Sequence, residues 1–389
     1  MTADVQGFVA SSFEGVAEAF EKTFDHNPTM GAALAVRVEG TPVLDLWGGL
    51  ADERTSTPWQ ENTTSVVFSC TKGLVSILAA HLAQQGRLDY EALVTDYWPE
   101  FGASGKESVR VKHLLSHQAG LSAPREDLTV EDITDWRRVV GVLQEQEPLW
   151  NPGEGHAYHA VTHGWLIGEV IRRITGISVG EYFRLAITAP LRADAWIGLP
   201  PEEKDRVAHL QVGSTLAEFI AAQAATRDPR QPDWPNRAMT LGGALSPALA
   251  TPDGDFNDYR LQAAEIPAAG GIATARSLAT IWSAVVTDTD NVRLLNDHTI
   301  ATATRVQTEG RPVFDVPPPF PRWGMGFQLD SPARQYLTPR GFGHDGAGGQ
   351  VAFADPEFKV GFAFTTNLME ALDSRGTAIV DALRSALRP

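Results

Sequence analysis

A serine and a lysine three positions apart are the first residues in this chain whose types and spacing suggest chemistry. Ser69-Cys70-Thr71-Lys72 follows an extended, apolar stretch over residues 64–68 and opens a segment of helical periodicity. Side chains at positions i and i+3 of a helix share one face, about 5–6 Å apart at Cβ, so the Lys72 amine can serve the Ser69 hydroxyl. A helix N-terminus also favours an oxyanion beside the Ser69 N–H. The pattern alone leaves a second interpretation open, in which Ser69 caps the helix and Lys72 is solvated.

A second candidate nucleophile is Ser178, because Gly176-Ile177-Ser178-Val179-Gly180 matches the pattern G-x-S-x-G. That pattern carries a nucleophile when a strand precedes the serine. Here the preceding residues, 165–174, place apolar side chains at helical spacing. We therefore expect Gly176 to end one helix, and Ser178 with Glu181 to form a capping box at the start of the next.

The elements that must position these residues can be read from apolar spacing and turn residues. The first part of the chain predicts a helix over residues 13–24, then two strands, 33–38 and 43–47, joined as a hairpin by Glu39-Gly40-Thr41. The helix that begins near Ser69 is expected to end near Gly86. The middle of the chain predicts mainly helices, at 109–117, 132–143, 163–174 and 179–187, and a long irregular region at 228–256.

The last part of the chain returns to strands. It predicts a helix at 274–286, strands at 325–329, 350–354 and 359–367, and a final helix at 377–387. This order is typical of an α/β domain built from both ends of the chain, residues 1–80 and 267–389. Residues 81–266 would form a mainly helical domain inserted between them.

Composition restricts the possible partners. The chain has 389 residues, of which 43% are hydrophobic and 21% charged, as in ordinary globular proteins. A net charge of −16 disfavours phosphate backbones and anionic lipid surfaces, so we expect no nucleic acid and no membrane partner. The single cysteine, Cys70, excludes an intramolecular disulfide and any multi-cysteine metal site. The first residues have neither a basic nor an apolar targeting region, and we expect a cytoplasmic protein.

Histidines and tryptophans add further candidates. His156, His159 and His163, or the pair His113 and His117, could be drawn as metal ligands. Neither set carries the glutamate of H-E-x-x-H, so we expect them in the core or behind the site, with no metal and no cofactor. Ten tryptophans, among them Trp98, Trp234 and Trp323, could wall an apolar acyl pocket, although we expect most of them in the core, and the sequence does not indicate which of them line a site.

Several motifs in a fixed order resemble a known superfamily. Ser69-Cys70-Thr71-Lys72 is followed by Val109 to Leu121, which includes His113-Leu114-Leu115-Ser116-His117, and by Trp150-Asn151-Pro152-Gly153 ahead of Tyr158. Pro267 to Gly271 and Gly343 to Gly349 come later. Together they resemble the serine β-lactamase-like superfamily, which shares the penicillin-binding protein fold, and most closely its class C β-lactamase and family VIII carboxylesterase branch. The resemblance covers nearly the whole chain.

The resemblance implies a fold and a set of roles. The fold is an α/β (α+β) one, with an antiparallel sheet flanked by N- and C-terminal helices, an inserted helical domain, and an active site in the cleft between them. By this resemblance Ser69 is acylated, and Lys72 and Tyr158 act together as the base. The backbone N–H groups of Ser69 and Ala347 would form the oxyanion hole. A phenol becomes a usable base beside a cation, because the cation favours the phenolate.

Departures from the family pattern bear on the substrate. Ala160 stands where the motif Tyr-x-Asn would place an amide, and no Lys-Thr-Gly occurs. His344-Asp345-Gly346 appears in place of that third motif and would contact substrate, with His344 replacing a permanently cationic lysine suited to a carboxylate. These replacements resemble family VIII esterases and imply a neutral, short-chain carboxylic ester as the small-molecule partner.

Two alternative functions stay open at this point. The first keeps the chemistry and changes the bond, as in a β-lactamase, a D-amino-acid peptidase or an amide hydrolase of the same superfamily. The second is a non-catalytic binding member of the fold, although Ser69, Lys72 and Tyr158 are all present. The sequence does not indicate the oligomeric state.

Overall fold

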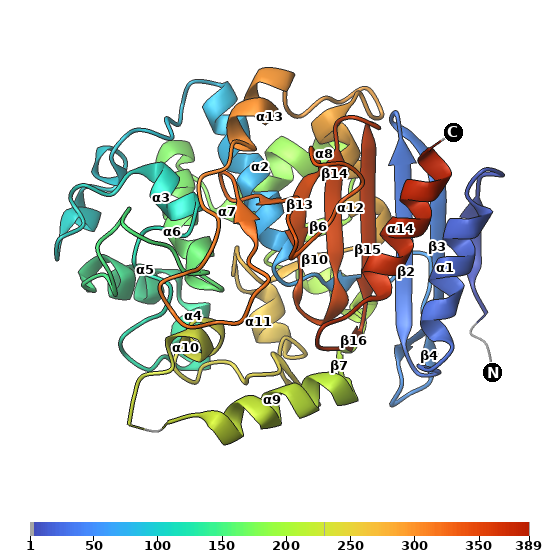
Figure 1. Cartoon of the computed structure of the whole chain (residues 1–389), viewed down its shortest axis with the longest axis horizontal. Helices are drawn as coiled ribbons and strands as arrows, with labels where there is room; N and C mark the ends of the chain where they lie inside the picture. The colour runs from blue at the N-terminus through green and yellow to red at the C-terminus, as the bar shows by residue number, and fades with distance from the viewer. Residues whose placement is uncertain (1–3, 229, 389) are drawn as a thin grey trace.

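A large antiparallel sheet built from both ends of the chain organises the protein. In the computed structural model, which describes residues 4–228 and 230–388, this sheet has nine strands in the order β1-β3-β2-β15-β14-β13-β12-β11, with β4 paired to β3 (Figure 1). The strands are β1 (Gln6–Val9), β2 (Gly31–Val38), β3 (Thr41–Asp52), β4 (Thr57–Pro58), β11 (Arg322–Trp323), β12 (Gln328–Leu329), β13 (Phe342–Asp345), β14 (Val351–Asp355) and β15 (Val360–Thr366). The fold expected from the resemblance, α/β with an antiparallel sheet, is confirmed.

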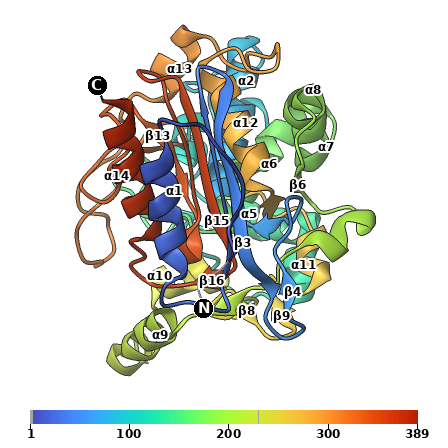
Figure 2. The same ribbon diagram turned by 90° about the vertical axis from the view of Figure 1, so that its right-hand side faces the viewer.

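Helices cover both faces of this sheet. Figure 2 shows α1 (Glu14–Glu21) and α14 (Arg375–Leu387) on one face and α12 (Ala275–Val286) on the other. Two apolar cores result, one under α1 and α14 and a larger one that extends from α12 into the helical part. The central strands β2 and β15 are therefore buried along most of their length and read as continuous apolar runs. Gly361 permits the approach of α12, because a Cβ there would lie 2.3 Å from Ser283 N.

A second, small sheet fixes the segment that leads to Ser69. It has the order β5-β10-β6, formed by β5 (Ser65–Val66), β10 (Gly271–Ala273) and β6 (Ala195–Ile197). Directly after β5 the chain turns into α2 (Cys70–Gln84), most of whose residues are buried. Residues from three distant parts of the chain thus meet at the start of α2.

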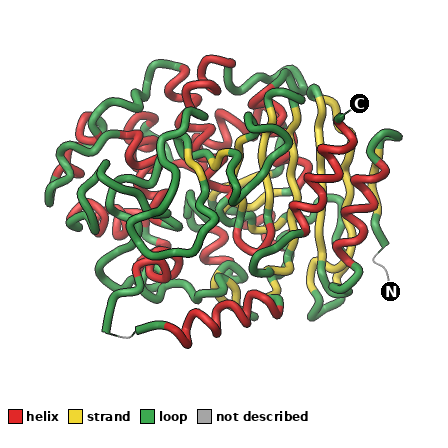
Figure 3. The backbone as a smooth tube through the Cα atoms, viewed as in Figure 1, coloured by secondary structure: helices red, strands yellow, loops and turns green. Residues whose placement is uncertain are grey.

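The middle of the chain is mainly helical, as predicted, and Figure 3 shows its short helices beside the strands of the sheet. Its helices are α3 (Val111–Leu115), α4 (Val130–Thr134), α5 (Trp136–Glu145), α6 (Thr162–Thr175), α7 (Val179–Phe183), α8 (Ala189–Leu191), α9 (Ser214–Thr226), α10 (Trp234–Thr240) and α11 (Tyr259–Ala263); α13 (Asp297–Ala303) follows later. Two short strand pairs complete the fold, β7 (Gln211–Val212) with β16 (Leu368–Met369), and β8 (Ala250–Thr251) with β9 (Gly254–Asp255). The division at 80/81 and 266/267 stays a prediction.

Some predicted elements differ from the structure. The helix predicted at 132–143 is split, because the Asp135 side chain accepts hydrogen bonds from Arg137 N and Arg138 N and starts a new helix. The strand predicted at 325–329 is wrong over its first half, where a turn closed by Gly324 N and Phe327 O separates β11 from β12. α9 has no counterpart among the predicted elements, since none of its residues is buried and no apolar face marks it in the sequence. No helix among residues 4–228 and 230–388 is both long and apolar enough to cross a bilayer.

Candidate active site

Ser69 lies at the N-terminus of α2 with its hydroxyl directed toward two polar side chains. Ser69 Oγ is 3.0 Å from Lys72 Nζ and 2.9 Å from Tyr158 Oη. In the described part of the chain the Ser69 side chain makes no capping hydrogen bond to the helix. The interpretation of Ser69 as a helix cap therefore does not fit. Phe68 precedes it with a left-handed backbone, φ 43°, a conformation that side chains rarely adopt outside strained or functional turns.

Lys72 is fully buried beneath the serine, which excludes the interpretation of a solvated lysine. Its Nζ donates to Ser69 Oγ, to Ala160 O at 2.5 Å and to Ala268 O at 2.9 Å. Burial lowers the pKa of Lys72 well below its ordinary value, because the charged amine loses its hydration. The three oxygen acceptors oppose that shift by stabilising the ammonium form. The Lys72 amine therefore gives up its proton more readily than an ordinary lysine does.

Tyr158 is held in the loop between α5 and α6 by aromatic packing. Its ring is stacked on Trp323, 5.4 Å away at 12°, and meets His117 edge-on at 5.0 Å. Lys72 Nζ lies 4.9 Å from the centre of the same ring. Burial raises the pKa of Tyr158 above its ordinary value, and its hydrogen bond to Ser69 opposes the shift. At rest Tyr158 is therefore a neutral phenol hydrogen-bonded to the serine.

The loop that carries Tyr158 is anchored by histidines. His159 donates from Nδ1 to Ala157 O at 2.7 Å and accepts from Leu121 N at Nε2, 3.2 Å away, so both ring nitrogens are used. Its backbone N–H donates to His117 Nδ1 at 3.2 Å. Burial lowers the pKa of His159 to about 4 and keeps the ring neutral. Within residues 4–228 and 230–388, no group of three or more His, Cys, Asp or Glu side chains is arranged to hold a metal ion.

His344 reaches the site from the large sheet. It lies on β13, is 2% exposed, and has its ring 6.1 Å from that of Tyr158 and 5.3 Å from that of Trp323. Burial and the neighbouring Lys72 lower the pKa of His344 to about 3. His344 is thus a neutral imidazole at physiological pH.

Asp345 is paired with an arginine. Arg334 Nε lies 2.5 Å from Asp345 Oδ2, and the Asp345 N–H donates to Gln328 Oε1 at 3.0 Å. Burial raises the pKa of Asp345, while Arg334 opposes the shift.

Cys70 is also fully buried, and burial raises the pKa of its thiol well above the ordinary value. That thiol is therefore protonated and unreactive at neutral pH.

Gly346 and Ala347 bring a backbone turn next to the segment that leads to Ser69. A Cβ on Gly346 would lie 2.3 Å from Val67 O, so only glycine allows this approach. Ala347 starts the short 3₁₀ turn Ala347–Gly349. Neither the Ser69 N–H nor the Ala347 N–H donates a hydrogen bond to another described residue. Both remain available to an oxyanion.

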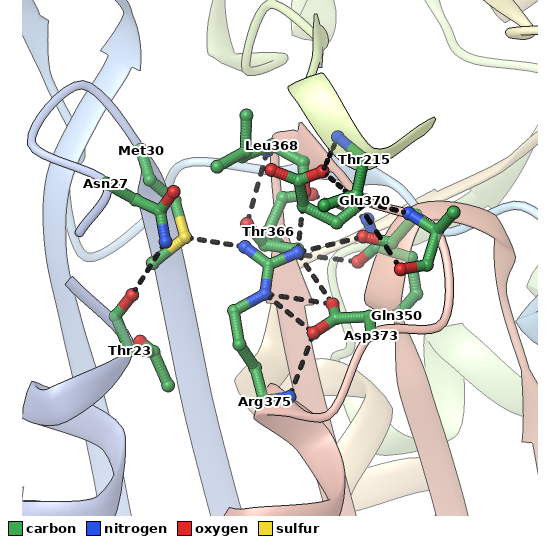
Figure 4. Close-up of polar contacts among 12 residues, drawn as sticks. Thr23, Asn27, Met30, Thr215, Gln350, Thr366, Leu368, Glu370, Asp373 and Arg375 are labelled. Atoms are coloured by element: carbon green, nitrogen blue, oxygen red, sulfur yellow. Dashed lines mark hydrogen bonds and ion pairs between the residues drawn. The ribbon is translucent and has the colours of Figure 1, made fainter. Parts of the chain in front are cut away.

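A buried ion pair supports this turn, and sequence reasoning did not identify it. Figure 4 shows Arg375 between Asp373 and the backbone, with Arg375 Nη2 donating to Leu368 O at 2.7 Å. The same nitrogen donates to Gly348 O at 3.1 Å, and the Arg375 and Asp373 side chains are only 10% and 8% exposed. Arg375 therefore holds the turn that contains Ala347. Asp373 and Arg375 are two positions apart, and in the sequence they resemble an ordinary pair of surface charges. The residues next to them in the chain give no sign that the pair is buried.

The alternative nucleophile Ser178 serves a structural role. Its Oγ accepts from Glu181 N at 3.2 Å and contacts the Glu265 carboxylate. Glu265 also accepts from Val179 N at 3.1 Å. Ser178 caps α7 as predicted, but the reciprocal half of the capping box, a bond from Ser178 N to the Glu181 carboxylate, is not among the contacts of the described residues. Gly176 ends α6 with φ 79°, as predicted.

The tryptophans named as pocket walls divide into two groups. Trp234 and Trp323 line a cavity of about 240 Å³ that Tyr158 also lines. Trp98 is fully buried, packs on Phe101 and does not line this cavity. Ser69 Oγ contacts the Lys72 amine and the Tyr158 phenol, and Tyr158 also lines the apolar cavity. A hydroxyl beside an amine and a phenol can form and release a covalent acyl intermediate.

Comparisons with known proteins agree with this geometry. The Beta-lactamase family model matches residues 16–385. The curated "Esterase/beta-lactamase LipL" of Mycobacterium tuberculosis is 34% identical over 371 residues, covering 93% of this chain and 83% of that protein. A crystal structure of a family VIII carboxylesterase aligns with a TM-score of 0.87 at 34% identity, covering 98% of this chain and 100% of the other. A penicillin-binding protein homolog from Caulobacter crescentus aligns with a TM-score of 0.86 at 35% identity and the same coverage. The chain therefore belongs to the Beta-lactamase family and is a serine hydrolase of that superfamily.

Proposed function

We propose that this protein is a serine carboxylesterase that hydrolyses neutral, short-chain carboxylic esters through an acyl-Ser69 intermediate. The observation that carries the proposal is the pair of contacts on Ser69 Oγ, 3.0 Å from Lys72 Nζ and 2.9 Å from Tyr158 Oη. A hydroxyl within hydrogen-bond reach of two groups that exchange protons is an activated nucleophile. Similarity to proteins named as esterases supports the choice of bond.

In acylation, Ser69 Oγ attacks the ester carbonyl carbon and passes its proton to the pair formed by Lys72 and Tyr158. The carbonyl electron pair moves to the oxygen, which accepts hydrogen bonds from the Ser69 and Ala347 N–H groups. When the C–O bond to the alcohol breaks, Tyr158 returns the proton to the leaving oxygen. Water then attacks the acyl group by the reverse sequence, which yields the acid and restores Ser69.

The Lys72 and Tyr158 pair works as one unit. A neutral amine with a neutral phenol holds the same number of protons as an ammonium with a phenolate, so the pair titrates together. When the pair takes up one more proton it becomes an ammonium beside a neutral phenol, and neither group can then accept the proton of Ser69. The lowered pKa of Lys72 therefore keeps the pair active at a pH well below the ordinary lysine value of 10.5.

The surroundings of Ser69 favour a neutral ester over a penicillin-like substrate. The neutral His344 gives a substrate carboxylate no cationic partner, and Ala160 supplies no side-chain amide. We propose His344, Asp345 and Gly346 as the strand segment along which the substrate lies, with Asp345 acting through its pair with Arg334. β-Lactam hydrolysis is the second candidate, because the similar protein LipL is named for both activities.

The test is the intact-protein mass after brief exposure to p-nitrophenyl acetate, with turnover of that ester and of nitrocefin measured in parallel. We expect one acetyl group on the wild type and on Ser178→Ala, and none on Ser69→Ala. We also expect poor nitrocefin turnover. Acetylation that survives Ser69→Ala but is lost in folded Ser178→Ala would reject the proposed nucleophile. Nitrocefin turnover faster than ester turnover would favour the β-lactamase function.

A further inference from the structure

An apolar cavity lies beside the phenol of Tyr158. Its volume is about 240 Å³, and it is open on one side and lined by residues of α10, by the proline-rich segment 310–321, and by the rings of Tyr158 and Trp323. Val313 N donates to His156 O at 2.9 Å, which ties the proline-rich segment to the loop that carries Tyr158. Among the described residues that line the cavity there is no Asp, Glu, Lys or Arg. Burial lowers the pKa of His156, so this lining residue is also neutral at physiological pH.

The position of Tyr158 identifies which half of an ester faces this cavity. In the reaction proposed above, the proton taken from Ser69 returns to the leaving oxygen through Tyr158. That oxygen must therefore come within hydrogen-bond reach of the Tyr158 hydroxyl, at about 2.6–3.2 Å. In the same reaction the carbonyl oxygen points to the Ala347 N–H. Ala347 lines a groove of about 620 Å³ that adjoins the cavity at Pro235, Met239, Val316 and Pro317 but includes neither Tyr158 nor Trp323. The alcohol carbon skeleton consequently continues on the Tyr158 side.

We propose that this cavity is the alcohol subsite and that it selects esters of neutral, apolar alcohols large enough to hold an aromatic ring. The proposal rests on the proposed esterase function. An apolar cavity of about 150 Å³ binds benzene, so 240 Å³ admits a ring with a short linker. The flat walls of Tyr158, Trp323 and Phe314 suit such a ring, since aromatic pairs gain from offset and edge-on contacts.

The test uses acetate esters whose alcohol grows from ethyl through butyl to 2-phenylethyl. All of them form the same acetyl-Ser69, so deacylation is common to the series and kcat/KM reports the alcohol alone. We expect kcat/KM to rise by about fourfold for each methylene that enters the cavity. A flat series, in an enzyme that still cleaves ethyl acetate, overturns the proposal. Failure to cleave any of these esters would instead overturn the esterase function.

Two phenylalanine truncations distinguish an effect of the cavity lining from a general effect of losing a phenylalanine. Phe314 lines the cavity, whereas Phe8 is 51% exposed on the edge strand β1. We expect Phe314→Ala to lower the 2-phenylethyl to ethyl preference by about tenfold, and Phe8→Ala to leave it unchanged. A second series, ethyl esters of acids of increasing size, shows whether the cavity holds the acyl part or the alcohol part of the substrate. If Phe314→Ala alters that acid series more than the acetate series, the cavity holds the acyl group and the proposal is wrong.

One further comparison tests the neutrality of the subsite. Acetylcholine and 3,3-dimethylbutyl acetate have nearly the same shape and differ by one positive charge. Aromatic faces can attract a cation, so shape alone does not settle the preference. We expect the neutral ester to have the higher kcat/KM, because the described lining offers no anionic side chain. A preference for acetylcholine would overturn the assignment to neutral alcohols.

Discussion

Lys72 and Tyr158 share one hydroxyl and one buried environment, and that environment affects them in opposite ways. Burial lowers the pKa of Lys72 and raises that of Tyr158, because both charged forms lose hydration. Burial therefore favours the neutral amine and the neutral phenol, whereas the three oxygen acceptors around Lys72 Nζ favour its ammonium form. Each can exchange a proton with Ser69 Oγ over a single hydrogen bond.

Removal of the phenol oxygen should separate the two bases. We expect Tyr158→Phe to lower kcat on p-nitrophenyl acetate by about 10²- to 10⁴-fold, because a positioned acid–base group contributes that much. Tyr90→Phe is the matched control, since the buried Tyr90 hydroxyl has no hydrogen-bond partner among the described residues. Thermal unfolding of both variants shows whether they are folded. If Tyr158→Phe retains most of kcat, Lys72 alone is the base.

At the scale of elements, the start of α2 depends on a threonine between the helix and the small sheet. Thr71 Oγ1 donates to Phe68 O at 2.5 Å and accepts from Gly271 N at 2.8 Å. The first bond holds the left-handed Phe68 and the second ties α2 to β10. The turn before the nucleophile is thus fixed by a residue inside the motif Ser69-Cys70-Thr71-Lys72 that does no chemistry itself.

Replacing this threonine by valine keeps its shape and removes both bonds. We expect Thr71→Val to lower the free energy of unfolding by about 1–3 kcal/mol, because the buried Gly271 N–H loses its partner. We also expect kcat to fall as the turn loosens. Thr365→Val on β15 is the control, because the described residues offer its buried Oγ1 no hydrogen bond. Urea unfolding measures the free energy of unfolding of both variants. Equal losses of that free energy in Thr71→Val and Thr365→Val would contradict a role for the Thr71 bonds.

At the scale of the whole molecule, four histidines from distant segments meet where the large sheet joins the helical part. His117, His159 and His163 come from the middle of the chain and His344 from β13; all four are buried. The His163 ring lies 5.1 Å from that of His117. Burial lowers the pKa of His163 well below its ordinary value.

This cluster should make the folded state sensitive to acid. A histidine that stays neutral when folded is protonated in the unfolded chain below its ordinary pKa of 6.5, so stability is lost as the pH falls. We expect His163→Leu to remove part of this loss. The free energy of unfolding of the variant, relative to that of the wild type, should therefore rise as the pH is lowered from about 7 to 5. His298→Leu, at an exposed position on α13, should show no such gain. A gain independent of pH would show that packing, not protonation, is responsible.

Much of the fold was predictable because the relevant signals are local. Helices α6, α12 and α14, the hairpin of β2 and β3, and the strands β14 and β15 follow directly from apolar spacing and turn residues. Two elements were predicted wrongly because a cap or a turn interrupts them, and the spacing of apolar residues does not indicate either. Asp135 starts a new helix inside an apolar periodic segment, and a tight turn after Gly324 interrupts a segment that resembles a strand.

The residue types and spacing in the sequence predicted the α/β organisation and the pair Ser69 and Lys72, because apolar periodicity and the i, i+3 spacing are local signals. The order of the motifs added the family resemblance, and with it the antiparallel sheet and Tyr158. Only the tertiary structure decided how burial acts on these side chains. It placed Lys72 under Ser69, made His344 neutral, paired Asp345 with Arg334 and brought Arg375 to the turn at Ala347. Proton affinity and the shape of the alcohol cavity depend on neighbours that are far apart in the chain, and such contacts leave no local pattern to read.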